Sequence, residues 1–323
     1  MLTAILSIRT VDNRGARRRR EDYWIVPMKR LFPPHTPAHP ARAVIFMSGA
    51  GTNAAAILHF AAEAGRSFTA AALATDAPDS GNAHELGRKF GIPVAALDLK
   101  KFYREHGESS IRLDSPHRRE LRQMWSERMY EMLAPFAPEF GILAGFVPLT
   151  NLTGRMPCLN VHPGDLTLKD ASGRRLLAGL HILPVERAIL AGFPTLRSSV
   201  ILAQVYTGDG SAEMDTGPVL GVSAPVAIDL LGATLDELRA LNAARVRGVP
   251  VADKLRDVAK YNVERLKTAG DHVVLPRTVE DFAEGRFHAE GERLGYLNDD
   301  GKLVSALTVE YHDDGKRVFL EHT

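Results

Sequence analysis

The sequence is poor in cysteine and in aromatic residues. Its 323 residues include one Cys and two Trp, and aromatic residues make up 7% of the total. A single thiol cannot form a disulfide framework or a multi-thiolate metal site. Cys158 lies within an apolar run, which predicts a buried and unreactive thiol. Because scarce cysteine is typical of proteins in reducing compartments, we expect a cytoplasmic location.

Long hydrophobic runs are also lacking. No apolar stretch of the sequence reaches the roughly 18 to 20 residues that cross a bilayer. The opening segment MLTAILSIRT has no basic residues ahead of its short apolar run, unlike a secretory signal peptide. The sequence therefore predicts a protein without a membrane partner.

Positive charge is concentrated at one end of the chain. Residues 1–42 hold nine Lys or Arg against three Asp or Glu, and they end in a proline-rich stretch, whereas the remaining residues hold more acidic than basic groups. This composition predicts a disordered N-terminal extension over residues 1–42. An acidic body is attracted only weakly to a polyanion, so we do not expect nucleic acid as a partner.

From residue 43 onward, short apolar segments alternate with segments of helical composition. This alternation predicts an α/β fold with a Rossmann-like, mostly parallel sheet and helices on both of its faces. The expected strands are 43–47, 68–76, 92–98, 139–145 and 158–162, and the expected helices are 54–65, 81–91 and 116–133.

The second half of the sequence predicts additions to this sheet. After a helix over 180–192, the runs 198–206 and 218–226 indicate a short antiparallel pair. A helical pattern follows over 234–270, and the turn sequences NDDG and HDDG indicate hairpins near the C-terminus. We therefore expect a catalytic domain over 43–230, followed by C-terminal helices and a β-meander over 231–323.

The first motif with chemical potential is SGAGTN (48–53), between the first strand and the first helix. Glycines let a ligand approach the backbone, and a helix N-terminus favours an anion, so the turn could hold a phosphate. It also fits the dinucleotide pattern G-x-G-x-x-A, with Asp76 at the end of the following strand. An ordinary tight turn has the same composition, and the motif alone leaves all three interpretations open.

Two further motifs contain polar groups suited to acyl chemistry. In LNVHPG (159–164), Asn160 and His162 are two residues apart and project to one side of an extended strand. An asparagine amide can stabilise an oxyanion, and a histidine can carry a proton near neutral pH. Asp215 in MDTGP could orient that histidine. A capping Asn, a core His and an ordinary Asp turn are the structural alternatives.

Together and in order, these motifs resemble those of the folate-dependent formyltransferases, above all phosphoribosylglycinamide formyltransferase. The likeness consists of SGAGTN, LAGF (143–146), LNVHPG, GLH (179–181) and DTGPVL (215–220). It extends from about residue 43 to 226, and more weakly over 273–287.

The resemblance implies transfer of a formyl group from the co-substrate 10-formyltetrahydrofolate to the amine of a small phosphorylated substrate. Glycinamide ribonucleotide, an intermediate of purine biosynthesis, is the first candidate. Asn160 and His162 would polarise the formyl carbonyl, and Asp215 would fix the histidine. The resemblance further assigns the phosphate to Gly51, Thr52 and Asn53, the folate to Phe146, Val147, Leu149 and the 207–215 loop, and a place in the substrate cleft to His181. It implies no metal.

The segment GDLTLKDASGRRLLAG (164–179) is longer and more polar than its counterpart in that family, and Val147-Pro148 replaces a common Met-Arg pair. Three alternatives remain at this point. One is formylation of methionyl-tRNA or of an amino sugar nucleotide, and another is a non-catalytic folate-binding relative. The third is an NAD-type oxidoreductase built on the glycine turn and Asp76, which leaves NVHPG and DTGP unexplained.

Overall fold

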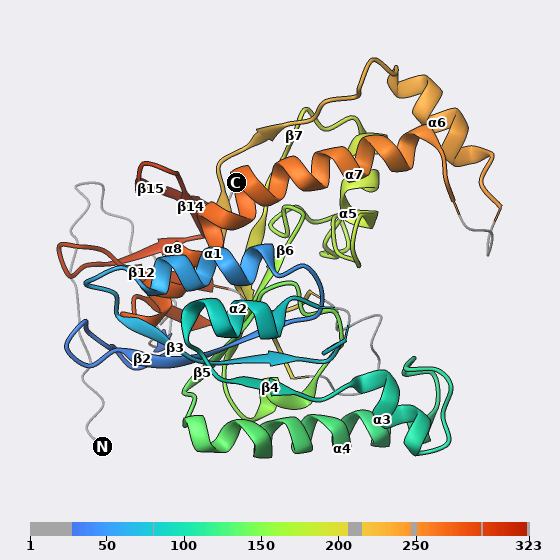
Figure 1. Ribbon diagram of the computed structural model, residues 1–323. Coiled ribbons are helices and arrows are strands. Elements are labelled where there is room, and N and C mark those ends of the chain that lie inside the picture. The colour runs from blue at the N-terminus through green and yellow to red at the C-terminus, as the bar shows by residue number, and fades with distance from the viewer. Residues whose placement is uncertain (1–27, 80, 206–214, 247–250, 292, 322–323) are drawn as a thin grey trace, which may run out of the picture.

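The computed structural model describes residues 28–79, 81–205, 215–246, 251–291 and 293–321. Within these ranges a nine-stranded sheet forms the centre of the molecule (Figure 1). Its strands are β2 (Ala41–Met47), β3 (Phe68–Thr75), β4 (Val94–Ala96), β5 (Phe140–Leu143), β6 (Cys158–His162), β8 (Ser199–Leu202), β9 (Val219–Ser223), β14 (Thr308–Tyr311) and β15 (Arg317–Leu320). Their order across the sheet is β15-β14-β9-β8-β6-β5-β2-β3-β4.

The strand order explains where a ligand can bind. β2 pairs in parallel with β3 on one side and with β5 on the other, and β5 pairs in parallel with β6. The chain thus winds outward from β2 in one direction and then in the opposite direction, which opens a crevice at the carboxyl ends of β2 and β5. β8 is antiparallel to both β6 and β9, as the sequence predicted. The predicted α/β architecture is confirmed.

Helices cover both faces of the sheet. On one face lie α1 (Thr52–Ala61), α2 (Ala83–Phe90) and α8 (His272–Ala283), and on the other lie α3 (Leu99–Glu105) and α4 (Pro116–Leu133) (Figure 1). Side chains of β2 alternate between the two cores: Ile45 packs with the first group and Phe46 with the second. This alternation is the period of two that an extended strand imposes.

A third group of helices projects from the end of the sheet. It consists of α5 (Leu183–Ala191), α6 (Leu235–Ala243) and α7 (Lys254–Leu266), which share a hydrophobic cluster (Figure 1). α7 continues through a π-helical turn, Lys267–Asp271, directly into α8. The long helical run therefore connects this group to the face of the sheet beside α1.

The two ends of the described chain pack together. β1 (Lys29–Arg30) joins β11 (Phe287–Glu290), β12 (Arg293–Leu297) and β13 (Leu303–Ala306) in a second sheet. The Phe32 ring is buried and stacks on Phe282 with a centroid distance of 4.7 Å. Ordered structure thus precedes the expected start at residue 43, because Phe32 supplies an apolar anchor inside the proline-rich stretch. Residues 1–27 of the predicted extension lie outside the described residues.

A buried carboxylate holds the last hairpin to the main sheet. Asp281 of α8 is fully buried, and it accepts hydrogen bonds from the Tyr296 hydroxyl (2.7 Å), the Tyr311 hydroxyl (2.6 Å) and the Arg317 Nε (2.8 Å). Burial raises the pKa of both tyrosines, so their hydroxyls remain donors. Removing one partner of a buried charge costs about 3–5 kcal/mol. β14 and β15 are part of the central sheet, and this carboxylate joins them to α8. β11 to β13 belong to the separate second sheet.

The remaining elements are short. They are the pair β7 (Thr195–Leu196) and β10 (Val226–Ala227), and the 3₁₀ turns η1 (Ala134–Phe136) and η2 (Asn151–Gly154).

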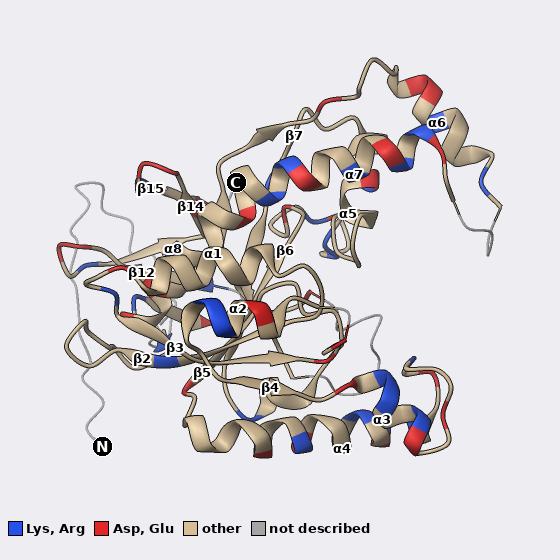
Figure 2. Ribbon diagram, in the orientation of Figure 1, with Lys and Arg blue, Asp and Glu red and all other residues tan. Residues whose placement is uncertain are grey.

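Positive and negative side chains alternate along α7 (Figure 2), so this helix offers no uniformly basic face. No helix among the described residues has both the length and the apolar composition needed to cross a membrane.

Candidate active site

The motifs of the sequence meet at the carboxyl edge of the sheet. The glycine turn follows β2, and the segment after β5 passes beside it: the Ser48 N–H donates to the Gly145 carbonyl (3.3 Å), and the Val147 N–H donates to the Ser48 hydroxyl (3.0 Å). Asn160 and His162 end the neighbouring strand β6. Segments that are about 110 residues apart in sequence thus form one site.

His162 is held between two oxygen acceptors. Its side chain is 3% exposed; its Nδ1 lies 3.3 Å from Asp215 Oδ1, and its Nε2 lies 2.7 Å from the Leu177 carbonyl oxygen. Both ring nitrogens thus face oxygen atoms, so the ring is held from two sides. The predicted proximity of Asp215 to His162 is present in the structure.

The backbone after His162 is shaped to keep this ring in place. A Cβ atom at Gly164 would come within 3.1 Å of His162 Nε2 and 3.0 Å of the Leu177 carbonyl oxygen, so a side chain there would press on the ring. Ser199, opposite His162 on β8, donates its hydroxyl to the Gly164 carbonyl (2.8 Å) and accepts from the Leu166 N–H (3.0 Å). The turn that ends β6 is therefore tied to the adjacent strand.

Asp215 occupies an unusual backbone conformation. Its φ is +57°, a left-handed value that costs a non-glycine residue roughly 1–2 kcal/mol. Its carboxylate is 8% exposed, and Oδ2 accepts from the Gly179 N–H at 2.8 Å. The carboxylate thus bridges His162 and the end of the 164–179 segment. Residues 206–214, which include most of the loop predicted to contact folate, lie outside the described residues.

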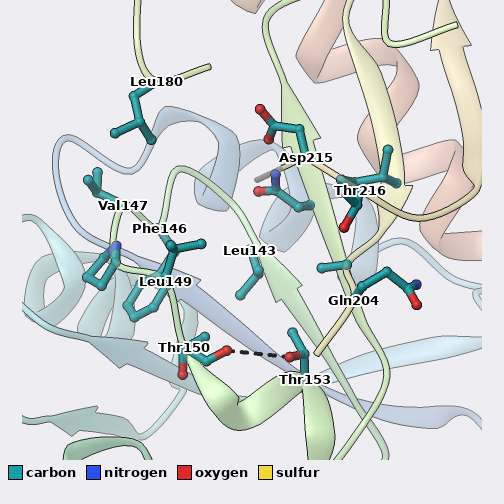
Figure 3. Close-up of a pocket in the computed structure, with 14 residues that line it drawn as sticks. Leu143, Phe146, Val147, Leu149, Thr150, Thr153, Leu180, Gln204, Asp215 and Thr216 are labelled. Atoms are coloured by element: carbon teal, nitrogen blue, oxygen red, sulfur yellow. Dashed lines mark hydrogen bonds between the residues drawn. The ribbon is translucent and has the colours of Figure 1, made fainter. Parts of the chain in front are cut away.

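Two pockets adjoin Asn160 and Asp215. The smaller pocket has a volume of about 100 Å³ and apolar walls, with Leu180 and Asp215 at one end and Thr150 and Thr153 at the other (Figure 3). The larger pocket has a volume of about 340 Å³, and residues of α7 form part of its wall. Phe146, Val147 and Leu180 line both pockets. Asn160 and Asp215 therefore lie where the two spaces meet.

The predicted folate and substrate residues divide between these pockets. Leu149 lines the smaller pocket, whereas His162 and His181 line the larger one. His181 is exposed and has a left-handed backbone with φ of +56°. Of the predicted phosphate cradle only Asn53 lines the larger pocket, and Gly51 and Thr52 are not part of that lining.

Sequence reasoning missed the residues that the α7–α8 run contributes. Lys260, Glu264, Lys267 and Asp271 line the larger pocket, and Lys267 Nζ lies 2.6 Å from Glu264 Oε1. The helical spacing of the buried apolar residues Leu275, Val279 and Phe282 was a usable signal for α8. The π-helical turn itself has no local sequence signature that we recognise.

The π-helical turn brings a carboxylate to the start of α1. Asp271 is buried, its Oδ2 accepts from Asn53 Nδ2 (2.8 Å), and its Oδ1 accepts from the Ser198 hydroxyl. Burial raises the pKa of Asp271. Gly270 permits this approach, since a Cβ there would come within 2.5 Å of Ser198 Oγ. Asn53 Oδ1 is buried without a hydrogen-bond partner among the described residues.

Two other expectations can be compared with the site. Asp76, the acid that a dinucleotide would need, lines neither pocket, and burial raises its pKa. Its position gives no support to the oxidoreductase alternative. Within the described ranges, no group of three or more His, Cys, Asp or Glu side chains is arranged to hold a metal ion.

Comparison with known proteins gives matches at the level of structure. Neither a family model nor a curated protein sequence matches the chain. The phosphoribosylglycinamide formyltransferase of Coxiella burnetii is similar over 82% of this chain and 96% of its own length, with 20% identity and a TM-score of 0.52. The glycinamide ribonucleotide transformylase 1 of Symbiobacterium toebii is similar over 80% of this chain and 95% of its own length, with 22% identity and a TM-score of 0.50.

A hydrolytic enzyme has the same fold. The formyltetrahydrofolate deformylase of Pseudomonas syringae matches 83% of this chain and 67% of its own length, with 14% identity and a TM-score of 0.51. These similarities show that the chain shares the fold of these enzymes, which is the α/β fold that its motifs predicted.

Proposed function

We propose that this protein transfers a formyl group from 10-formyltetrahydrofolate to the amine of a small phosphorylated substrate, with glycinamide ribonucleotide of purine biosynthesis as the first candidate. The observation that carries the proposal is the convergence of Asn160, His162 and Asp215 at the junction of two pockets. One pocket suits a flat, mostly apolar donor and the other suits a charged acceptor. The formyl group would bridge them.

The smaller pocket has the properties of a pterin site. Its walls include Leu143, Phe146 and Ile201, which provide apolar contact for a flat ring system. Polar groups at its ends, Thr150 and Gln204 among them, supply hydrogen bonds. Ligand pockets of this type combine apolar walls with a few directional polar groups.

The reaction follows from the groups around the formyl carbon. The acceptor nitrogen attacks the carbonyl, a C–N bond forms, and negative charge develops on the formyl oxygen. The Asn160 amide is a donor for that charge, and one such donor typically contributes about 10²- to 10³-fold. An N–H of His162 is a second donor once the formyl oxygen replaces the Leu177 carbonyl as its acceptor. The bond to the folate nitrogen then breaks, and the proton lost by the amine passes to that nitrogen. The His162–Asp215 pair, 3.3 Å apart, is the relay for this proton.

The larger pocket fits an acceptor with both anionic and donor groups. Lys260 and Lys267 offer ammonium groups to a phosphate on one side of the pocket, where Glu264, the partner of Lys267, and Asp271 also lie. Asn53 Oδ1, buried and without a partner, is an acceptor for a hydroxyl or amine of the substrate. Because an unsatisfied buried oxygen costs about 1–3 kcal/mol, a substrate that satisfies it gains affinity. These contacts support a phosphorylated, hydroxyl-bearing amine.

The cysteine is consistent with an enzyme of a reducing compartment. Cys158 is buried at the start of β6, the strand that carries Asn160 and His162, and burial raises the pKa of its thiol to about 12. Such a thiol is inert, so the proposed chemistry has no role for it. A cytoplasmic location is part of the proposal.

The test uses purified protein with 10-formyltetrahydrofolate and glycinamide ribonucleotide. We expect tetrahydrofolate to be released only when the amine is present, and His162→Ala to reduce kcat by about 10²- to 10⁴-fold. His59→Ala is the matched control, because His59 is exposed and lines neither pocket. Release of formate without an amine would identify a hydrolase instead. Equal turnover by the wild-type protein and His162→Ala would contradict the proposal.

A further inference from the structure

We propose that Arg175 is a positioning residue, which holds Asp215 in the backbone conformation that lets its carboxylate reach His162. The inference rests on the proposed function and extends it to the 164–179 segment, which no motif explains. Arg175 donates through Nη1 to the carbonyl oxygen of Asp215 and through Nη2 to that of Gly217. One guanidinium thus grips two carbonyl groups on the turn that carries the proton relay.

The segment that presents Arg175 is a small ordered hairpin. Lys169 and Arg175 form an antiparallel bridge, and the Leu176 N–H donates to the Leu168 carbonyl at 3.0 Å. The hairpin turns at Gly173, whose φ is +80°. This conformation is favourable for glycine and costly for other residues.

Asp170 closes the turn of this hairpin. Its Oδ1 accepts from the Ser172 hydroxyl (2.6 Å), from the Ser172 N–H (2.8 Å) and from the Arg174 N–H (3.0 Å). Hydrogen bonds from Ser172 and Arg174 lower the pKa of this carboxyl to about 2. The turn is therefore stabilised by its own side chain, and the position of Arg175 is defined before any substrate binds.

The turn that Arg175 grips needs support. Asp215 has φ of +57°, a conformation that most residues with a side chain disfavour, whereas Gly217, with φ of +103°, adopts positive φ without strain. A Cβ at Gly217 would come within 2.2 Å of the Leu202 carbonyl oxygen, which shows how closely the turn passes β8. A planar guanidinium holds two parallel donors in a fixed fork that matches two carbonyl oxygens, whereas the donors of an ammonium rotate on a flexible stem.

The 164–179 segment also fixes the carboxylate of Asp215. The Gly179 N–H donates to Asp215 Oδ2 at 2.8 Å, which leaves Oδ1 directed at His162 Nδ1. Backbone and carboxylate of Asp215 are thus both fixed by residues 175–179. The polar composition of this segment has a physical reason: it supports the proton relay.

The experiment compares Arg175→Met with Arg174→Met in the formyl transfer assay. Arg174 is the matched control because its side chain is 83% exposed and bonds to Asp170 within the hairpin. We expect Arg175→Met to lower kcat by about 10²-fold, the typical effect of a small displacement of a catalytic group, with little change in either KM. Arg175→Lys should recover only part of the loss, and Arg174→Met should behave as wild type.

A double-mutant cycle separates positioning from a general structural role. If Arg175 acts through Asp215, then Arg175→Met should change kcat by less than about twofold in an Asp215→Asn background. Additive losses would overturn the inference. A raised KM for folate with unchanged kcat would also overturn it, since Arg175 would then be a ligand contact.

A measurement without turnover tests the inference even if the proposed function fails. The ¹⁵N chemical shifts of the His162 ring, recorded at one pH, report its contact with Asp215. We expect them to change in Arg175→Met in the same direction as in Asp215→Asn, and to stay unchanged in Arg174→Met. Unchanged shifts in Arg175→Met, with thermal stability retained, would contradict the inference.

Discussion

The junction of the two pockets and the end of the larger pocket beside α1 differ in how their polar groups are satisfied. At the catalytic junction, both ring nitrogens of His162 and both carboxylate oxygens of Asp215 have partners within the protein. In the larger pocket, Asn53 Oδ1 is buried without a partner. In the proposed reaction, the groups at the junction are held in place before substrate binds, whereas part of the acceptor site is completed only by the substrate. Four experiments can break or sharpen this contrast.

The largest effect is expected for Asn160→Ala, at the junction itself. Loss of one oxyanion donor should lower kcat by about 10²- to 10³-fold and leave both KM values nearly unchanged. Steady-state kinetics measure the two parameters separately. Asn298→Ala, in a distant hairpin turn, is the control. A raised KM with normal kcat would mean that Asn160 binds the ground state, and the contrast between the two ends would disappear.

A glycine lies at each of the two places compared, Gly164 beside His162 and Gly270 beside Ser198, so the same substitution by alanine can be made at both. Gly164→Ala should displace His162 and lower kcat by about 10²-fold. Gly270→Ala should instead push the π-helical turn away from Ser198, raise the KM of the acceptor and reduce the free energy of unfolding by about 1–3 kcal/mol. Kinetics and urea unfolding measure these effects. The same kinetic profile for both variants would contradict the division of roles.

A smaller effect is expected at the start of α1. Asn53→Ala removes the unpartnered oxygen and the bond to Asp271, so the KM of the acceptor should rise about tenfold while kcat stays constant. Thr52→Ala is the matched control, because Thr52 is exposed and lies outside the lining of the larger pocket. If Thr52→Ala raises the KM equally, the acceptor uses the whole glycine turn, as the sequence motif predicted.

The smallest effect concerns the pH dependence of stability. Because burial raises the pKa of Asp271, the folded protein binds this proton more tightly than the unfolded chain. The stabilising contribution is complete below the ordinary pKa near 3.8 and is lost as pH rises through the folded value. Stability of the wild type relative to Asp271→Asn should therefore fall with rising pH, by about 1.4 kcal/mol per unit of pKa shift. Urea unfolding between pH 4 and pH 7 measures it, and an increase would contradict the assignment.

Local sequence patterns correctly predicted those helices and strands whose own residue preferences agree with their packing in the fold. The helix expected over 116–133 is α4, which begins after the capping residue Ser115 with proline in its first turn. The strand expected over 158–162 is β6. Asn160, His162 and Asp215 were predicted as site residues because their residue types suit one reaction and their motifs occur in order, and the structure places His162 beside Asp215.

Packing between distant segments accounts for what the sequence did not reveal. Asp271 reaches Asn53 only because Gly270 lets the helix approach Ser198 and Ser223, residues that are far away in the sequence. The order of residues 28–42 depends in the same way on Phe32, which packs against Phe282 at the other end of the chain. The residue pattern within either segment does not indicate such long-range contacts.

The attachment of β14 to β9 bears on how this protein can be shortened. A fragment limited to residues 43–230 would turn β9 from an interior strand into an open edge, which invites association with other chains. It would also lose α8 and, with Phe282, part of the apolar cover over one face of the sheet. The unit able to fold independently therefore includes the C-terminal hairpin, and trimming the chain to its motif-bearing half is expected to yield aggregates.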